Sequence, residues 1–207
     1  PLKDAERVSE GVKQLAANTS GVRIRFKTDS KFVAVSVKYS DVCRMEHMSL
    51  AGTSGIDMYT RENGGYLFQT LFLPPISKED SFESIHYFDT RQIGDITLNL
   101  PLYSSVSDIY IGLDKNALIE HGEKYKNKRP VVYYGSSITQ GGCATRPGNS
   151  YPAIISRKLN LDFVNLGFSG NAKGEPAMAE YIAKLDMSCF VFDYDFNAPT
   201  LDFLKNT

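Results

Sequence analysis

The segment Val131–Gly142, with the sequence VVYYGSSITQGG, constrains the fold of this chain more than any other. Its first four residues are β-branched or aromatic, which is typical of a strand buried on both faces of a parallel sheet. Small polar residues and glycines follow at once, as in a turn that leads from a strand into a helix. Because an open α/β sheet places its chemistry at the carboxyl ends of its strands, Ser137 is a candidate nucleophile at that edge.

The residues after Pro130 predict alternating strands and helices. The expected elements are strands at Val131–Tyr134, Phe163–Leu166 and Cys189–Phe192, and helices at Tyr151–Leu159 and Glu175–Leu185. This order predicts parallel strands joined by right-handed crossovers.

The residues before this segment predict a domain of short strands. Period-two alternation or short apolar runs mark residues 22–27, 33–39, 56–59, 65–72, 96–100 and 109–113. One helix is expected near Asp4–Ala17. Several short strands separated by turns suggest a jelly-roll-like β-sandwich. We therefore divide the chain into an all-β sandwich at residues 1–128 and an α/β domain at residues 129–207.

Composition limits the kinds of partner and cofactor that this chain is expected to bind. The net charge of −1 over 207 residues gives no broad field for nucleic acid or an anionic membrane. No apolar run is long enough to span a bilayer. We expect neither partner.

The three cysteines are widely spaced and form no C-x-x-C pair: Cys43, Cys143 and Cys189. They predict neither a disulfide framework nor a zinc site, and we expect buried thiols. Asp193 and Asp195 have no His or Cys set around them, so we expect no metal. The turn at Gly135–Gly142 has no lysine, unlike a P-loop, and we expect no cofactor.

Three strand ends bring candidate catalytic groups to one edge of the predicted sheet. The first delivers Ser137, the second the glycine-rich turn around Gly170, and the third the carboxamide of Asn197. Acyl transfer requires a nucleophile and donors aimed at a developing oxyanion. The alternatives are structural: Ser137 as a helix cap, Asn197 as a turn residue and Gly170 as a tight-loop residue.

These blocks resemble those of the SGNH (GDSL-like) hydrolases. The nucleophile block is Gly135–Gly141, the glycine block is Asn165–Gly170, and the asparagine block is Asp193–Asn197. The segment Gly55–Tyr59 resembles the Gly-x-Asp-Leu-Tyr signature of the β-domain that precedes the esterase domain in one branch, with Met58 in place of leucine. The resemblance covers nearly the whole chain.

The resemblance implies the first part of a three-layer α/β/α (flavodoxin-like) domain and a carboxylic-ester hydrolase. Ser137 would attack an ester carbonyl, and Ser137, Gly170 and Asn197 would form the oxyanion hole. A small-molecule or carbohydrate ester, such as an acetylated sugar, is the implied substrate. Arg146 in the next loop either contacts substrate or holds the loop by bonding a carbonyl. The family and a removed leader suggest a secreted or periplasmic protein, with a cytoplasmic one as the alternative.

The sequence departs from the family at the general base. The family uses the histidine of an Asp-x-x-His block, and no histidine follows His121 before Thr207. We interpret the chain as part of a longer esterase, with docking of His47 or His121 near Ser137 as the weaker alternative. A rival function is a non-catalytic module that binds glycan or protein. Oligomeric state is open.

Overall fold

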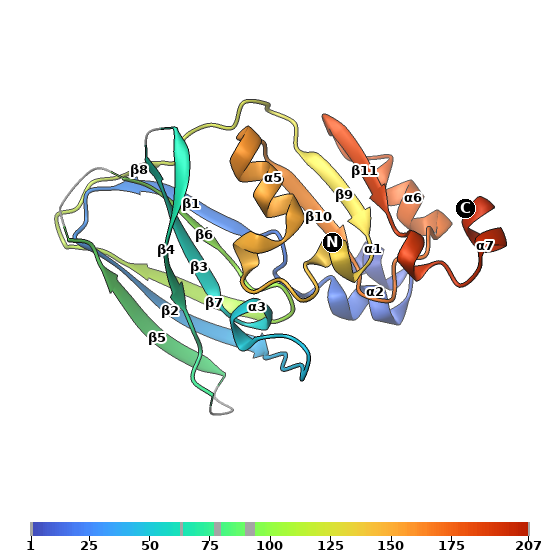
Figure 1. Cartoon of the computed structure of the whole chain (residues 1–207), viewed down its shortest axis with the longest axis horizontal. Coiled ribbons are helices and arrows are strands. Elements are labelled where there is room, and N and C mark those ends of the chain that lie inside the picture. The colour runs from blue at the N-terminus through green and yellow to red at the C-terminus, as the bar shows by residue number, and fades with distance from the viewer. Residues whose placement is uncertain (1, 63, 77–79, 90–93, 207) are drawn as a thin grey trace.

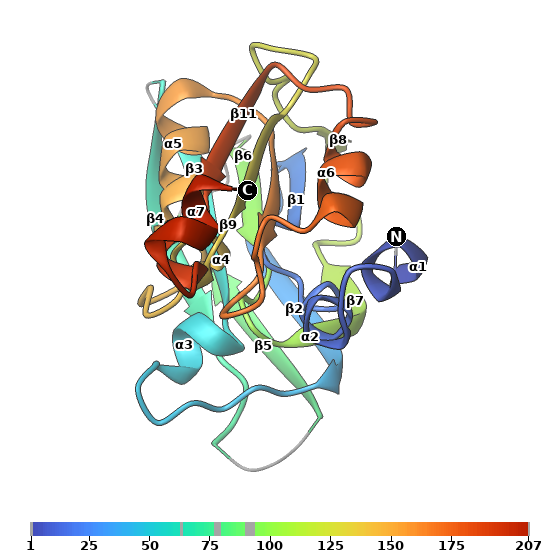
Figure 2. The same cartoon turned by 90° about the vertical axis from the view of Figure 1, so that its right-hand side faces the viewer.

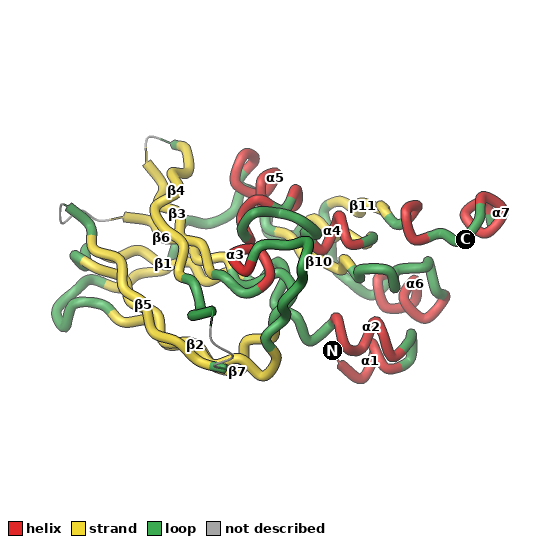
Figure 3. Tube along the Cα trace, turned by 60° about the horizontal axis from the view of Figure 1, so that its bottom comes forward, coloured by secondary structure: helices red, strands yellow, loops and turns green. Residues whose placement is uncertain are grey.

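A computed structural model of the chain describes residues 2–62, 64–76, 80–89 and 94–206. Figure 1 shows a strand-rich part on the left and an α/β part on the right. The secondary-structure colours of Figure 3 show the same division, with most helices gathered around the α/β part. We call these the β part (residues 23–121) and the α/β part (residues 131–205) below.

The β part contains two antiparallel sheets. Its strands are β1 (Arg23–Thr28), β2 (Phe32–Asp41), β3 (Ile56–Glu62), β4 (Gly65–Phe72), β5 (Ser81–Tyr87), β6 (Gly94–Asn99), β7 (Ser105–Gly112) and β8 (Ile119–His121). The larger sheet has the order β4-β3-β6-β1-β8 and the smaller one β5-β2-β7. A short helix, α3 (Leu50–Thr53), precedes β3.

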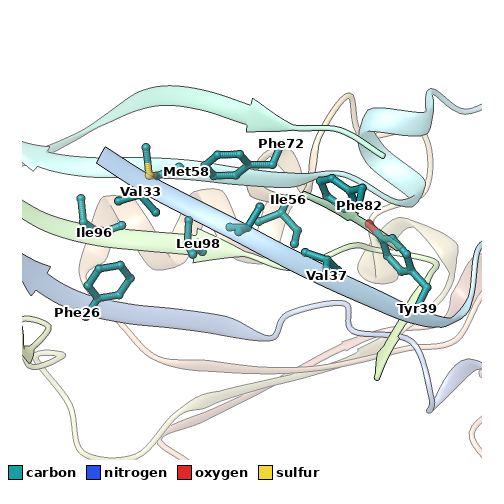
Figure 4. Packing of buried hydrophobic residues seen from close by; sticks show 11 residues of the cluster. Phe26, Val33, Val37, Tyr39, Ile56, Met58, Phe72, Phe82, Ile96 and Leu98 are labelled. Carbon is teal, nitrogen blue, oxygen red and sulfur yellow. The ribbon is translucent and has the colours of Figure 1, made fainter. Parts of the chain in front are cut away.

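One hydrophobic core joins the two sheets. The alternation that predicts β2 sends Val33, Val35 and Val37 inward, where each is almost completely buried. They meet buried residues of the larger sheet such as Met58 and Leu98 (Figure 4). Apolar burial of this kind contributes roughly 25 cal/mol per Å² removed from water, so this core is the main source of the β part's stability.

The sequence did not reveal two of these strands. In β5 the apolar residues do not keep to one face, because Phe82 is buried in the core while Ile85 and Tyr87 are exposed. β8 has only three residues and all of them are exposed, so no apolar pattern marks it as a strand.

The α/β part is built on three parallel strands in the order β10-β9-β11. They are β9 (Val131–Gly135), β10 (Phe163–Gly167) and β11 (Cys189–Asp193), each within one residue of the predicted bounds. The helices are α4 (Ser137–Gln140), α5 (Tyr151–Leu159), α6 (Pro176–Ile182) and α7 (Leu201–Lys205). Helix α5 has the predicted bounds.

Helices cover both faces of this sheet, as Figure 2 shows with α5 and α6 on opposite sides of β11. Ala153 of α5 packs with Tyr133 and Phe163 on one face. Met178 of α6 packs around Tyr134 on the other.

The N-terminal segment packs on the α/β part. Instead of the single helix expected near residues 4–17, the chain forms α1 (Leu2–Glu6) and α2 (Glu10–Leu15). Ser9 separates them by capping α2, its Oγ accepting a hydrogen bond from Val12 N at 3.1 Å. Ala5 and Val12 are buried in the same cluster as Tyr134. The predicted first domain, residues 1–128, therefore includes two helices that pack against the α/β part rather than against the β part.

The expectation that the cysteines are buried is wrong for two of them. Cys143 and Cys189 are exposed, and only Cys43 is partly covered. Cys189 opens β11, which is an edge strand of its sheet, and Cys143 lies in the loop after α4. Among the described residues, no helix is long and apolar enough to cross a membrane.

Candidate active site

The strand register brings the three predicted turns to one edge of the sheet. Gly135 at the end of β9 pairs with Gly167 on β10 and with Asp193 on β11, so the three strands end level. Ser137 follows two residues after its strand, and Gly170 and Asn197 follow three and four residues after theirs. The carboxyl edge therefore receives all three groups, where an open α/β sheet binds its ligands.

The helix-capping role in the serine turn belongs to Ser136 rather than Ser137. The fully buried Ser136 accepts a hydrogen bond from Ile138 N at 3.2 Å, and its own N–H donates to Asp193 O at 3.0 Å. Within the described part of the chain, the hydroxyl of Ser137 has no hydrogen-bond partner. Ser137 is the first residue of α4, so its N–H also has no acceptor inside that helix. Both groups remain available to a ligand.

The glycine turn presents a second main-chain donor. Phe168 N donates to Gly135 O at 2.9 Å, which ties the start of this turn to the end of β9. Gly170 has a φ of +69° and lies exposed, and no atom beyond its chain neighbours comes within 4 Å of where a Cβ would lie. Glycine adopts this left-handed conformation without the penalty that other residues pay. No acceptor for the Gly170 N–H occurs among residues that the structure describes.

The asparagine turn is fastened to the glycine turn. Asn197 Nδ2 donates to Phe168 O at 3.2 Å, and its main-chain N–H donates to Tyr194 O at 2.8 Å. A carboxamide nitrogen has two protons. One holds the two turns together, and the second can serve a ligand.

A polar cluster missed by the sequence analysis joins the serine turn to β11. Asp193 Oδ2 accepts hydrogen bonds from Thr139 Oγ1 at 3.0 Å and from Tyr151 Oη at 3.1 Å. Burial, with a contribution from the Asp193 carboxylate, raises the pKa of Tyr151 to about 12. The only sequence signal was the place of Asp193 at a strand end. The described residues contain no cluster of three or more His, Cys, Asp or Glu side chains that could hold a metal.

Arg146 faces the β part. Its Nε donates to Tyr59 Oη at 3.2 Å, lies 3.6 Å from Asp57 Oδ2, and its guanidinium carbon lies 4.2 Å from the Phe68 ring centre. These contacts hold the loop after α4 against β3 and β4. A substrate contact by Arg146 stays a prediction.

Asp57 of the Gly55–Tyr59 segment fastens the same loop. Its buried carboxylate accepts hydrogen bonds from Gly148 N and from Asn99 Nδ2, both at 2.7 Å. Gly148 fits because a Cβ there would lie 2.7 Å from Asp57 Oδ2. Burial raises the pKa of Asp57 to about 6, against the opposing effects of these hydrogen bonds and of the nearby arginines.

No histidine of this chain is hydrogen-bonded to Ser137 in the described structure. His47 is exposed, and its main-chain oxygen lies 3.9 Å from Cys143 Sγ. His86 of β5 packs against the ring of Phe88, which follows that strand, and His121 belongs to β8. The base that the family resemblance implies, the histidine of an Asp-x-x-His block, stays a prediction.

A serine turn, a glycine turn and an asparagine turn at one edge of a parallel sheet define the class of the SGNH-type hydrolases. Family comparisons agree with this class. Residues 1–119 match the GxDLY family, described as the N-terminus of Esterase_SGNH_hydro-type, and residues 128–204 match the GDSL-like Lipase/Acylhydrolase family. The chain therefore belongs to the GDSL-like, SGNH-type hydrolases with an N-terminal GxDLY domain.

Solved structures resemble the chain over nearly its whole length. A structure described as a GDSL-like lipase of Bacteroides ovatus ATCC 8483 is 31% identical with a TM-score of 0.88, covering 98% of this chain and 61% of that one. The salicylyl-acyltransferase SsfX3 from a tetracycline biosynthetic pathway is 21% identical with a TM-score of 0.75, covering 100% and 55%. A family two carbohydrate esterase of Clostridium thermocellum is 14% identical with a TM-score of 0.58, covering 87% and 60%.

The chain thus spans 55 to 61% of the length of these three solved chains. The two matches below 25% identity show a shared fold alone. No curated protein sequence matches the chain significantly.

Proposed function

We propose that this chain carries the nucleophile and the oxyanion donors of a carboxylic-ester hydrolase. The observation that supports it most is the level ending of β9, β10 and β11, which brings Ser137, Gly170 and Asn197 to one edge. Acyl transfer requires a nucleophile and hydrogen-bond donors to the oxyanion. Among the described residues, the Ser137 hydroxyl has no hydrogen-bond partner and the Gly170 N–H has no acceptor, so both can take these parts.

In the proposed reaction, Ser137 Oγ attacks the ester carbonyl carbon and its proton passes to a general base. The carbonyl oxygen becomes an oxyanion that accepts hydrogen bonds from the N–H groups of Ser137 and Gly170 and from Asn197 Nδ2. Collapse of the tetrahedral intermediate breaks the bond to the alkoxy oxygen, which leaves as the alcohol after taking the proton. Water then attacks the acyl-enzyme, and the carboxylic acid leaves. The base is the histidine that the family resemblance implies.

We infer that the acyl group is carried by a carbohydrate. The support is a fold shared with a carbohydrate esterase, together with a β part that is fastened to the serine-turn loop through Asp57 and Arg146. Acetyl is the simplest acyl group to expect. We also infer that the β part is a jelly-roll-like sandwich, and that the α/β part begins a three-layer α/β/α domain.

The test is hydrolysis of p-nitrophenyl acetate and of acetylated xylose by the full-length protein, comparing wild type with Ser137→Ala. The matched control is Ser188→Ala, which removes an exposed hydroxyl bonded to Pro130 O at 3.2 Å before the amino end of β11. We expect Ser137→Ala to lower kcat by at least about 10³-fold and Ser188→Ala to leave it unchanged. Equal turnover by wild type and Ser137→Ala would exclude the serine mechanism.

A non-catalytic glycan-binding or protein-binding module is the second candidate, because none of the chain's histidines is hydrogen-bonded to Ser137 in the described structure. The same assay distinguishes it. The non-catalytic module would be favoured if the full-length wild-type protein hydrolysed neither ester but still bound xylose without its acetyl group.

A further inference from the structure

Gln140 is a deeply buried polar side chain that the proposed reaction does not use. It closes α4, three residues after Ser137, and only 1% of its surface is exposed. A buried carboxamide is tolerated when its donors and acceptor are satisfied. Its partners therefore show what this side chain holds in place.

The three hydrogen bonds of the Gln140 carboxamide join three separate segments. Its Oε1 accepts from Ser169 N at 2.9 Å, in the glycine turn. Its Nε2 donates to Leu102 O in the β part and to Asn18 Oδ1 after α2, both at 3.2 Å. Both protons and the acceptor are thus used by the chain itself.

The Ser169 bond lies one residue from a proposed oxyanion donor. Ser169 N and Gly170 N belong to consecutive peptide units, and Gly170 has no side chain to limit rotation of the second one. An anchored Ser169 N–H restricts the direction in which the Gly170 N–H can point.

The main chain of Gln140 also limits movement of the glycine turn. A Cβ on Gly167, at the end of β10, would lie 2.1 Å from Gln140 N. The serine helix and the start of the glycine turn are therefore in direct backbone contact. The Gln140 side chain and main chain together hold the two turns at a fixed separation.

We propose that Gln140 is a positioning residue for the oxyanion hole, which anchors the glycine turn to the β part through Leu102 O. This inference rests on the proposed ester hydrolysis. It also makes the β part a component of the active site, since one of the atoms that orient Gln140 belongs to it. Positioning of this kind acts on the transition state, so its loss lowers kcat more than it changes KM.

The test compares Gln140→Met with Gln14→Met in the full-length protein. Methionine has nearly the volume of glutamine without its hydrogen bonds, and Gln14 is an exposed glutamine of α2 whose Nε2 lies 3.5 Å from Glu10 Oε1. Sites are counted with a fluorophosphonate, so that kcat refers to folded, reactive enzyme. We expect Gln140→Met to lower kcat per site by about 10-fold to 100-fold with KM within about threefold, and Gln14→Met to change neither.

Amide hydrogen exchange supplies a readout that does not depend on turnover. The Ser169 amide is expected to exchange slowly in wild type and at least about 10-fold faster in Gln140→Met. If Gln140→Met does not fold, Gln140→Glu replaces it. This variant keeps the acceptor for Ser169 N–H and loses the donors, so slow Ser169 exchange should persist while kcat per site falls.

Two results overturn the inference in different ways. A wild-type kcat per site in Gln140→Met, even with a lower melting temperature, would show that Gln140 only stabilises the fold. An unprotected Ser169 amide in wild type would remove the anchor itself. Failure of the proposed function is a separate result, seen as turnover in wild type that does not depend on Ser137.

Discussion

Replacing Asp57 by asparagine should change how the stability of this chain depends on pH. Asp57 of β3 is fully buried where the β part contacts the loop that carries Gly148. Burial raises the pKa of its carboxyl from 3.8 to about 6 in the folded chain. The folded state therefore holds a proton at pH values where the unfolded chain has already released it. Stability from this group is complete below pH 4 and is lost as the pH rises through 6.

The size of the pKa shift of Asp57 determines how much the free energy of unfolding changes with pH. Each pKa unit corresponds to about 1.4 kcal/mol, so a rise from 3.8 to about 6 predicts a loss of about 3 kcal/mol between pH 4 and 7. Asparagine does not titrate. Its side-chain oxygen can accept the hydrogen bond from Gly148 N. Its side-chain nitrogen can donate to Asn99 Oδ1 if the Asn99 carboxamide rotates by 180°. The Asp57→Asn variant should therefore gain stability relative to wild type by about 3 kcal/mol over that pH range.

Urea unfolding of both proteins at pH 4, 5, 6 and 7 measures this difference. Groups other than Asp57 titrate alike in the two proteins, so their contributions cancel. A difference that stays constant within about 0.5 kcal/mol would refute the reasoning. A difference that changes in wild type's favour as the pH rises would show that Arg146 and Arg157 outweigh burial and lower the pKa of Asp57.

Three further predictions concern packing and exposure. Leu98→Ala should cost about 2–5 kcal/mol in urea unfolding, because Leu98 is completely buried in the core between the sheets; a loss below about 1 kcal/mol would contradict that packing. Gly167→Ala should cost at least about 2 kcal/mol in the same assay, since its Cβ would lie 2.1 Å from Gln140 N, and an unchanged midpoint would disprove the contact. Cys143 should react with a thiol reagent faster than Cys43, because Cys143 is exposed while burial raises the pKa of the partly covered Cys43 thiol; equal rates by peptide mapping would show otherwise.

Much of the fold could be predicted from short-range patterns. The alternation in β2 and the apolar run of β9 each follow from which faces are buried, and both lie where the patterns indicate. β5 was missed because its apolar residues are divided between two faces, so its sequence lacks the period that identifies a strand. The sequence predicts one helix near residues 4–17, whereas the chain forms two, because Ser9 caps the second helix and interrupts the first.

The sequence predicts less of the candidate site than of the fold. Parallel strand order predicts which turns meet at one edge, and this was enough to select Ser137, Gly170 and Asn197. It does not predict partners that are distant in sequence. The bonds of Gln140 to Leu102 and of Asp57 to Gly148 join residues 38 and 91 positions apart. Such pairs arise from the docking of the two parts, which no local pattern records.

Ester hydrolysis by this protein requires a reactive serine at the shared edge of β9, β10 and β11. Its most direct test is mass spectrometry of the full-length protein after treatment with a fluorophosphonate, which forms a stable adduct with an activated serine. We predict one adduct, on the peptide that contains Ser137, and none in Ser137→Ala. Absence of an adduct in wild type, or an adduct on a different residue, would contradict the central claim.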